Sequence, residues 1–154
     1  MNNMIFKEVY GFFKFLTQYQ IQVGVFSAKT KRKETYNIGL TNAELMFIHE
    51  NGSPLHHLPE RPVLDMTIKY GQSLLPSTIR KAIDAYSVSG ENGAKKEFDK
   101  LCLRMENYAR DIIYSNDGRL APNAPSVAER KKGNHPLFDT GQLARSITCR
   151  LIKL

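Results

Sequence analysis

The chain has 154 residues, a formal net charge of +7 and two cysteines. This length can bury a real core without disulfides or metals, so we expect a single domain over residues 1–154. The positive charge predicts acidic partners, either nucleic acid or an acidic protein surface.

No apolar run approaches the roughly 18 residues of a membrane span, and a secretory signal pattern is absent, which argues against membrane insertion and export. Cys102 and Cys149 lie on apolar faces and are interpreted as reduced core thiols.

The first segment, residues 1–18, places apolar side chains near helical spacing and predicts an amphipathic helix. Its polar face has little cationic excess, so we interpret its apolar face as packing on a sheet or a neighbouring subunit and not on a membrane. Alternation of apolar with small or polar residues then predicts a strand over residues 21–26. Residues 36–40 are a candidate for a second short strand.

A basic run separates these two strands, and its candidate contact residues are Lys31, Arg32 and Lys33. No aromatic residue is interleaved with them, so the stacking platform of a single-strand binder is missing. The run is interpreted as a solvated loop, with contact to phosphate or to a partner protein as the alternative.

The next segment begins at Thr41, which stands three residues before Glu44 in the spacing of a capping box and predicts a helix start. Asn51-Gly52 predicts its end as a left-handed cap. Four residues of metal-ligand type lie near this end: His49, Glu50, His56 and His57. They lack the histidine pair at i and i+4 that would place two imidazoles on one helical face, so neither a metal nor any other cofactor is expected.

Helical patterns fill the centre of the chain. Arg61-Pro62 predicts a helix start, with Pro62 in the first helical position, and Gly71 predicts its end. Pro76 predicts the start of a second helix, and the serine- and glycine-rich residues 87–93 predict a turn. Residues 94–114 have apolar side chains at steps of three and four and predict the longest helix.

Residues 115–136 have little periodicity and are predicted to form an extended loop that is mobile in the isolated subunit. Only residues 126–132 have a pattern that indicates a brief helix. The cationic side chains of the loop are candidates for contacts in an assembly: Arg119, Arg130, Lys131, Lys132 and His135. We interpret the segment as an assembly arm that becomes ordered against a neighbour, with an idle surface loop as the alternative.

The last segment begins with Asp139 and Gln142 in the spacing of a second capping box, which predicts a short helix. Residues 147–154 then alternate and predict a final strand. Together these elements predict an α+β fold in which a small antiparallel sheet carries several helices.

Two stretches resemble a known family. PLFDTGQLARSI, residues 136–147, resembles the P-L-x-D-T-G-x-L-x-x-S-I signature that ends many small neck and tail-completion proteins of tailed bacteriophages. FIHENGSPLHHLPERPVLDMTI, residues 47–68, is similar to that family's helix-ending H-E-x-G-S/T and the P-x-R-P segment that follows it. The two motifs stand in the family's order. The matching positions are His49, Glu50, Gly52, Arg61, Pro62, Asp139, Thr140, Gly141, Leu143 and Ser146.

The resemblance implies a structural virion protein that joins or completes the tail at the head–tail interface, as part of a homo-oligomeric ring. It implies other neck, connector or tail proteins as partners, DNA passing nearby through the channel, and assembly in the host bacterial cytoplasm. The alternatives are a tail terminator of the same particle and a basic nucleic-acid-binding module. The residues themselves offer no phosphate-cradling glycine loop and no nucleophile elbow, so an enzyme is not expected.

Overall fold

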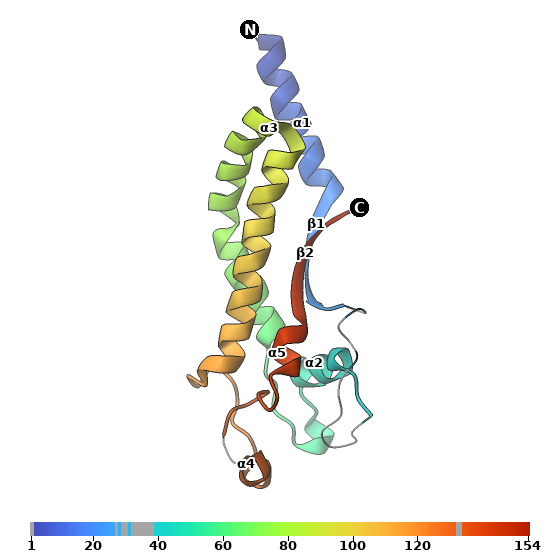
Figure 1. Cartoon of the computed structure of the whole chain (residues 1–154), viewed down its shortest axis with the longest axis vertical. Helices are drawn as coiled ribbons and strands as arrows, with labels where there is room; N and C mark the ends of the chain where they lie inside the picture. Colours follow the sequence, from blue (N-terminus) through green and yellow to red (C-terminus); the bar gives the residue numbers. More distant parts are fainter. Residues whose placement is uncertain (1, 27, 29–30, 32–38, 132–133) are drawn as a thin grey trace.

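The computed structural model describes residues 2–26, 28, 31, 39–131 and 134–154. In these residues the fold is α+β, with helices around one two-stranded antiparallel sheet, and the predicted fold class is confirmed (Figure 1). The elements in chain order are α1 (Asn2–Gln18), β1 (Tyr19–Val25), α2 (Asn42–Asn51), the 3-10 helix η2 (Pro54–His56), α3 (Val63–Ser115), α4 (Pro125–Lys131), α5 (Gln142–Ser146) and β2 (Ile147–Lys153).

The long helix α3 reverses direction at Gly90, where φ is 59° and ψ is −147°. Residues 63–89 form a first arm and residues 91–115 a second arm, and the two lie side by side (Figure 1). Gly93 lies at the start of the second arm, where an added Cβ would overlap the Ala85 carbonyl of the first arm. The turn predicted over residues 87–93 is therefore confirmed as the reversal of a helical hairpin.

The predicted helix end at Gly71 and the predicted helix start at Pro76 are both wrong, because α3 continues through them. Gly71 is a packing residue, since an added Cβ would lie 2.6 Å from the Met105 Sδ of the second arm. Pro76 costs a helix interior about 3 kcal/mol, because its ring removes a backbone donor. The arm stays helical around it, and its next turns bury Thr78 and Ala82.

The sheet joins the first and last strands of the chain, with Tyr19 opposite Lys153 and Val25 opposite Ile147. One face of this sheet packs on α3, mainly through β2. The strand prediction for residues 21–26 is confirmed with β1 beginning two residues earlier, and the prediction for residues 147–154 corresponds to β2. The candidate strand over residues 36–40 lies largely outside the described residues.

Two apolar clusters hold these elements together. In one, Phe12 and Phe15 of α1 pack on the hairpin, with the Phe15 and Phe98 rings 5.9 Å apart between centroids. The other joins α2, α5 and the open end of the hairpin through Met46, Ile112 and other buried residues.

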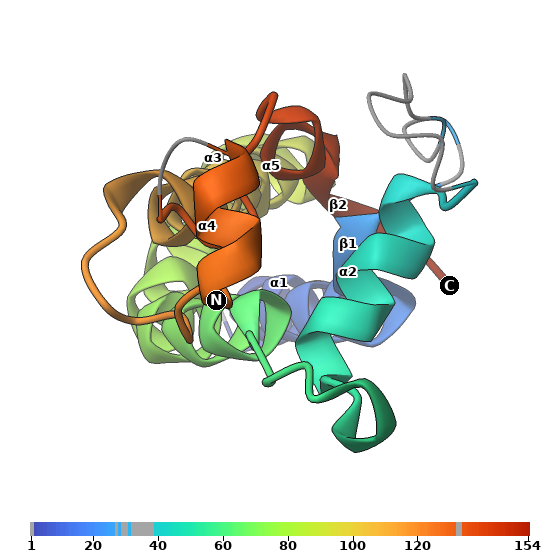
Figure 2. The same ribbon diagram turned by 90° about the horizontal axis from the view of Figure 1, so that it is seen from below.

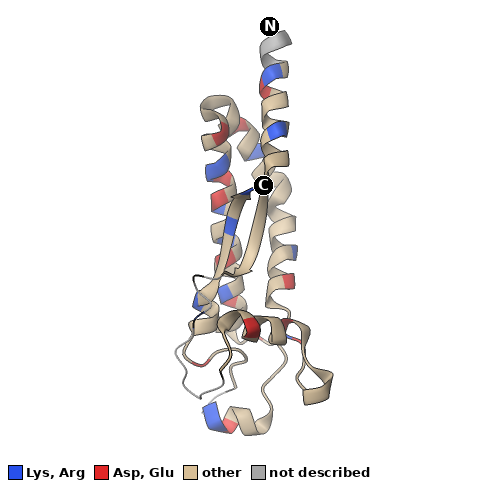
Figure 3. Ribbon diagram, turned by 90° about the vertical axis from the view of Figure 1, so that its right-hand side faces the viewer, with Lys and Arg blue, Asp and Glu red and all other residues tan. Residues whose placement is uncertain are grey.

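Positive and negative residues are interspersed along the helices (Figure 3). In the part of the chain that the structure describes, every helix is too short or too polar to cross a bilayer.

Candidate functional site

The two motif stretches, which are far apart in sequence, meet where α2, α4 and α5 come together (Figure 2). They line one cavity of about 350 Å³, which we call the basal cavity. His49 and Arg61 contribute to its wall from the first motif, and Asp139 and Leu143 contribute from the second. The sequence placed each motif in a turn but did not show that the two turns share a site.

The His-Glu pair that ends α2 also fixes the start of α3. The Glu50 carboxylate accepts hydrogen bonds from the Leu64 N–H at 2.9 Å and the Asp65 N–H at 2.8 Å. These first-turn amides have no partner within their own helix, and a negative charge there also complements the helix dipole. Glu50 therefore sets the junction between α2 and α3. Pro62 is the residue before the helix, so its predicted place as the first helical residue is wrong by one position.

The tight turn after α2 requires glycine at position 52. Its φ is 65°, and an added Cβ would lie 2.8 Å from the Leu58 carbonyl oxygen and 2.9 Å from the Glu60 nitrogen. Ser53 and Leu58 then exchange two backbone hydrogen bonds of 2.9 Å and close the loop around η2. The other end of α2 carries the predicted capping box, which is confirmed at Thr41 and Glu44.

Arg61 is only 3 % exposed and joins the start of α3 to the segment that follows the hairpin. Its Nε donates to the Ala121 carbonyl at 2.8 Å, and its Nη2 donates to the Pro122 carbonyl at 2.7 Å. Burial lowers the pKa of the guanidinium, which nevertheless remains a cation at neutral pH. The Nη1 of Arg61 also lies 3.3 Å from the Nδ1 of His49. Arg61 therefore connects the start of α3, the end of α2 and the segment after the hairpin.

His49 is neutral at neutral pH. Burial, and then the positive charges of Arg61 and Lys131, lower the pKa of its imidazole to about 4. The neutral ring can accept a hydrogen bond from Arg61 at Nδ1, which places its proton on Nε2. His49 is therefore an acceptor inside the motif. Within the described ranges, no group of three or more His, Cys, Asp or Glu side chains is arranged to hold a metal ion.

The predicted capping box of Asp139 and Gln142 is wrong. Helix α5 has Gly141 at its N-cap with φ 72°, and no side chain caps it. Leu137, with φ 60°, and Gly141 both turn the chain through left-handed conformations, which leaves Asp139 two residues before the cap. The Asp139 Oδ2 is buried without a hydrogen-bond partner among the described residues, and the side chain lines the basal cavity.

The remaining residues of the second motif build the turn into β2. The Thr140 carbonyl accepts a hydrogen bond of 2.8 Å from Arg145 Nη2. Leu143 and Ser146 are buried, and the Ser146 hydroxyl donates to the Leu143 carbonyl at 2.6 Å. Burial and this hydrogen bond account for the motif positions Leu143 and Ser146 through local packing.

The basic candidates that the structure describes lie in different parts of the fold. Arg119 pairs with two nearby carboxylates, Asp111 of α3 at 2.6 Å and Asp117 at 2.7 Å. Its hydrogen bonds lower the pKa of the Asp117 carboxyl to about 2. Arg130 and Lys131 end α4 and line the basal cavity.

The other candidates are spread along the chain. The His135 ring packs edge-on against Phe138, with 5.7 Å between centroids. Lys31 lies between β1 and α2, where its carbonyl accepts a hydrogen bond of 3.4 Å from Asn42. Arg32, Lys33 and Lys132 lie outside the described residues.

The brief helix predicted over residues 126–132 is confirmed as α4, which begins one residue earlier, at Pro125. The flank before α4 is held to the domain by Arg61, and a hydrogen bond joins this flank to the one after α4. Leu120 is buried beside the carbonyls that Arg61 binds, and the Asn123 Nδ2 donates to the His135 carbonyl at 3.1 Å. Mobility of the segment in the free subunit stays a prediction.

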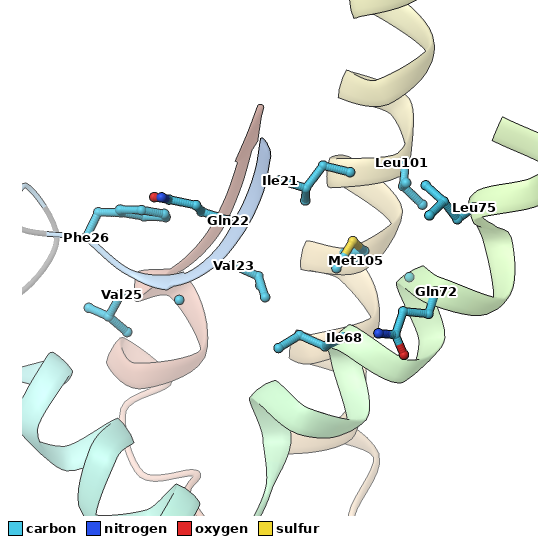
Figure 4. A pocket seen from close by; sticks show the side chains of 12 residues that line it. Ile21, Gln22, Val23, Val25, Phe26, Ile68, Gln72, Leu75, Leu101 and Met105 are labelled. Atoms are coloured by element: carbon cyan, nitrogen blue, oxygen red, sulfur yellow. The ribbon is translucent and has the colours of Figure 1, made fainter. Parts of the chain in front are cut away.

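Two apolar surfaces are not distinguished in the sequence. One is an exposed face of α1 made by Phe6, Val9, Tyr10 and Phe13. The other is a cavity of about 610 Å³ between β1 and the first arm of α3 (Figure 4). The spacing of the α1 residues is visible in the sequence, but it was merged there with the buried face of the same helix. The cavity depends on contacts between distant segments and has no sequence signal.

Comparisons with protein-family models, curated proteins and solved structures find no match for the chain. Any function assigned to it therefore rests on its own residues and their geometry.

Proposed function

We propose that the chain is a structural virion protein of a tailed phage, which joins or completes the tail at the head–tail interface as one subunit of a ring. The observation that carries this proposal is that the two motif stretches form one packed unit. Glu50 caps α3 next to the residues that Arg61 ties together, and Leu143 of the second motif packs in the same apolar cluster as Met46 and Val63.

A structural role also agrees with how the polar motif residues are used. Arg61, His49 and Glu50 are occupied by contacts that fix the junction of α2, α3 and the segment after the hairpin. Their hydrogen-bond partners are backbone groups and each other, which supports a scaffold better than a reactive centre. The exposed apolar face of α1 supports a subunit that is covered by a neighbour in its working state.

The test is genetic and visual. An early stop codon in the reading frame of a phage that encodes the chain should leave DNA-filled heads and separate tails, and the wild-type chain supplied from a plasmid should restore joined particles. Joined, infectious particles in the absence of the chain would contradict the proposal. Tails of irregular length would instead indicate a tail terminator.

The basic charge gives a nucleic-acid-binding module as the alternative. Such a module would bind DNA as a free subunit, with an affinity that falls steeply as salt rises. The engagement of Arg119 by two carboxylates reduces the charge available for such binding. Salt-sensitive DNA binding by a chain that is absent from purified particles would favour the module.

A further inference from the structure

Helix α1 has two separate apolar faces. Phe12 and Phe15 are buried against the hairpin, and the Phe12 ring lies 5.6 Å from the Tyr86 ring between centroids. A second face is formed at positions i, i+3, i+4 and i+7, which share one side of a helix. We call it the α1 stripe, and its members are Phe6, Val9, Tyr10 and Phe13, which are 72 %, 49 %, 64 % and 62 % exposed.

The α1 stripe is large enough to belong to an interface. Aromatic side chains present about 200 Å² each, so the exposed parts of its three aromatic residues amount to roughly 400 Å². This is about half of the ~800 Å² that each partner buries in a standard protein interface. Helix α1 also extends past the turn of the hairpin, which leaves its N-terminal half open to a neighbour (Figure 1).

A matching surface lies elsewhere on the same chain. The cavity beside β1, which we call the β1 groove, is walled by Ile21 and Val23 on one side and Ile68 on the other, with Met105 in its floor (Figure 4). Its volume is about 610 Å³, and the described residues that line it carry no charge. Apolar walls of this kind fit apolar and aromatic side chains and exclude charged ones.

The polar atoms of the two surfaces also match. Tyr10 is the one member of the α1 stripe with a polar group, and a buried tyrosine hydroxyl needs a hydrogen-bond partner. Gln72 lines the β1 groove from the first arm of α3, and its amide can donate to or accept from such a hydroxyl (Figure 4). The stripe of a chain cannot reach its own groove, because α1 runs directly into β1 and is held on the hairpin by Phe12 and Phe15.

We propose that the α1 stripe of one copy of this chain docks in the β1 groove of a second copy. Because the two surfaces are different patches of one molecule, the contact is head-to-tail, and repeated contacts of this kind close into a ring when the rotation allows it. The inference rests on the proposed ring subunit and deepens it by naming the two surfaces that join neighbours.

The first test measures the mass of the full chain in solution by sedimentation velocity. The wild type should form an oligomer, and Phe13→Glu and Ile68→Glu should each raise the subunit dissociation constant by about 30-fold or more, as expected for loss of a central interface residue. Lys14→Glu on the polar face of α1 and Leu103→Glu on the second arm are matched controls, which should assemble like the wild type. Circular dichroism should show that all four variants stay folded.

Mixing the two interface variants gives a sharper test. Phe13→Glu keeps an intact groove and Ile68→Glu keeps an intact stripe, so an equimolar mixture should form a one-to-one dimer and no larger species. Normal assembly by Ile68→Glu alone would show that the β1 groove is not needed for assembly, and would overturn the proposal. A wild type that stays monomeric, or that binds only vesicles of phosphatidylglycerol and phosphatidylethanolamine, would overturn it too. The proposed function would still be judged separately by the particles formed without the chain.

Discussion

At the scale of single residues, Arg61 and His49 show how a buried cation is accommodated in the motif. The guanidinium binds two backbone carbonyls and faces an imidazole that burial keeps neutral. Protonation of His49 would place a second positive charge beside Arg61 in a buried site, which is costly. The pair therefore couples the stability of this junction to pH.

Replacing His49 by Gln should remove part of the acid sensitivity of the fold. The pKa of His49 is about 4 in the folded chain and 6.5 in the unfolded chain, so the unfolded state binds a proton first as the pH falls. Stability from this group is complete above pH 6.5 and is lost towards pH 4, up to about 3 kcal/mol. Urea unfolding at pH 7 and pH 4.5 should show a larger loss for the wild type than for His49→Gln. Equal losses would mean that the pKa of His49 is the same in the folded and the unfolded chain.

Gly52→Ala should destabilise the chain more than Gly118→Ala. Both glycines have positive φ, 65° and 88°, so both substitutions introduce backbone strain of about 1 kcal/mol. Only at Gly52 would the new Cβ also meet backbone atoms, whereas open space surrounds Gly118. Thermal unfolding should place the midpoint of Gly52→Ala below that of Gly118→Ala, and coinciding midpoints would exclude the close approach to Leu58 and Glu60.

At the scale of elements, the predictable features are those that depend on neighbouring residues. The capping box at Thr41 and the turn at residues 87–93 depend on residues close together in the sequence, and both predictions are confirmed. Asp139 has the same spacing to Gln142, but the left-handed Gly141 between them moves the helix start. Gly71 was misread because its small size serves packing against Met105 on the other arm. Such contacts between distant segments leave no local pattern.

The cap that α2 supplies to α3 can be tested by Glu50→Ala. This substitution leaves the Leu64 and Asp65 amides without their carboxylate and should cost about 1–2 kcal/mol of unfolding free energy. Thr41→Ala, which removes an ordinary cap within α2, is the matched comparison and should cost about 1 kcal/mol. A Glu50→Ala variant as stable as the wild type would show that this junction is held by apolar packing alone.

At the scale of the whole molecule, the motifs were recognisable in the sequence but their shared cavity was not. Arg61 binds the carbonyls of residues 121 and 122, which follow it in the sequence only after the whole hairpin. No sequence pattern predicts this contact. The second apolar face of α1 can be identified as exposed only after the structure shows that Phe12 and Phe15 form the buried face. The folded chain therefore adds the spatial relations between segments that the sequence describes separately.

The segment around α4 should become less accessible to protease when the subunit assembles. Arg130 is exposed at the end of α4, and we expect trypsin to cut there quickly in the free subunit and slowly in purified particles, because a neighbour would order and cover the segment. The two samples need equal protease and salt, and cleavage within the well-packed second arm serves as the internal reference. Equal resistance in both samples would mean that the segment is packed on its own domain and is not an assembly arm.

The most direct test of the proposed role is to locate the chain in the particle. A small tag after Leu154, detected by gold-labelled antibody in electron micrographs of purified phage, should mark a single position at the junction of head and tail. Absence of the label from intact particles, with the tagged chain present in the infected cell, would contradict a structural place in the virion.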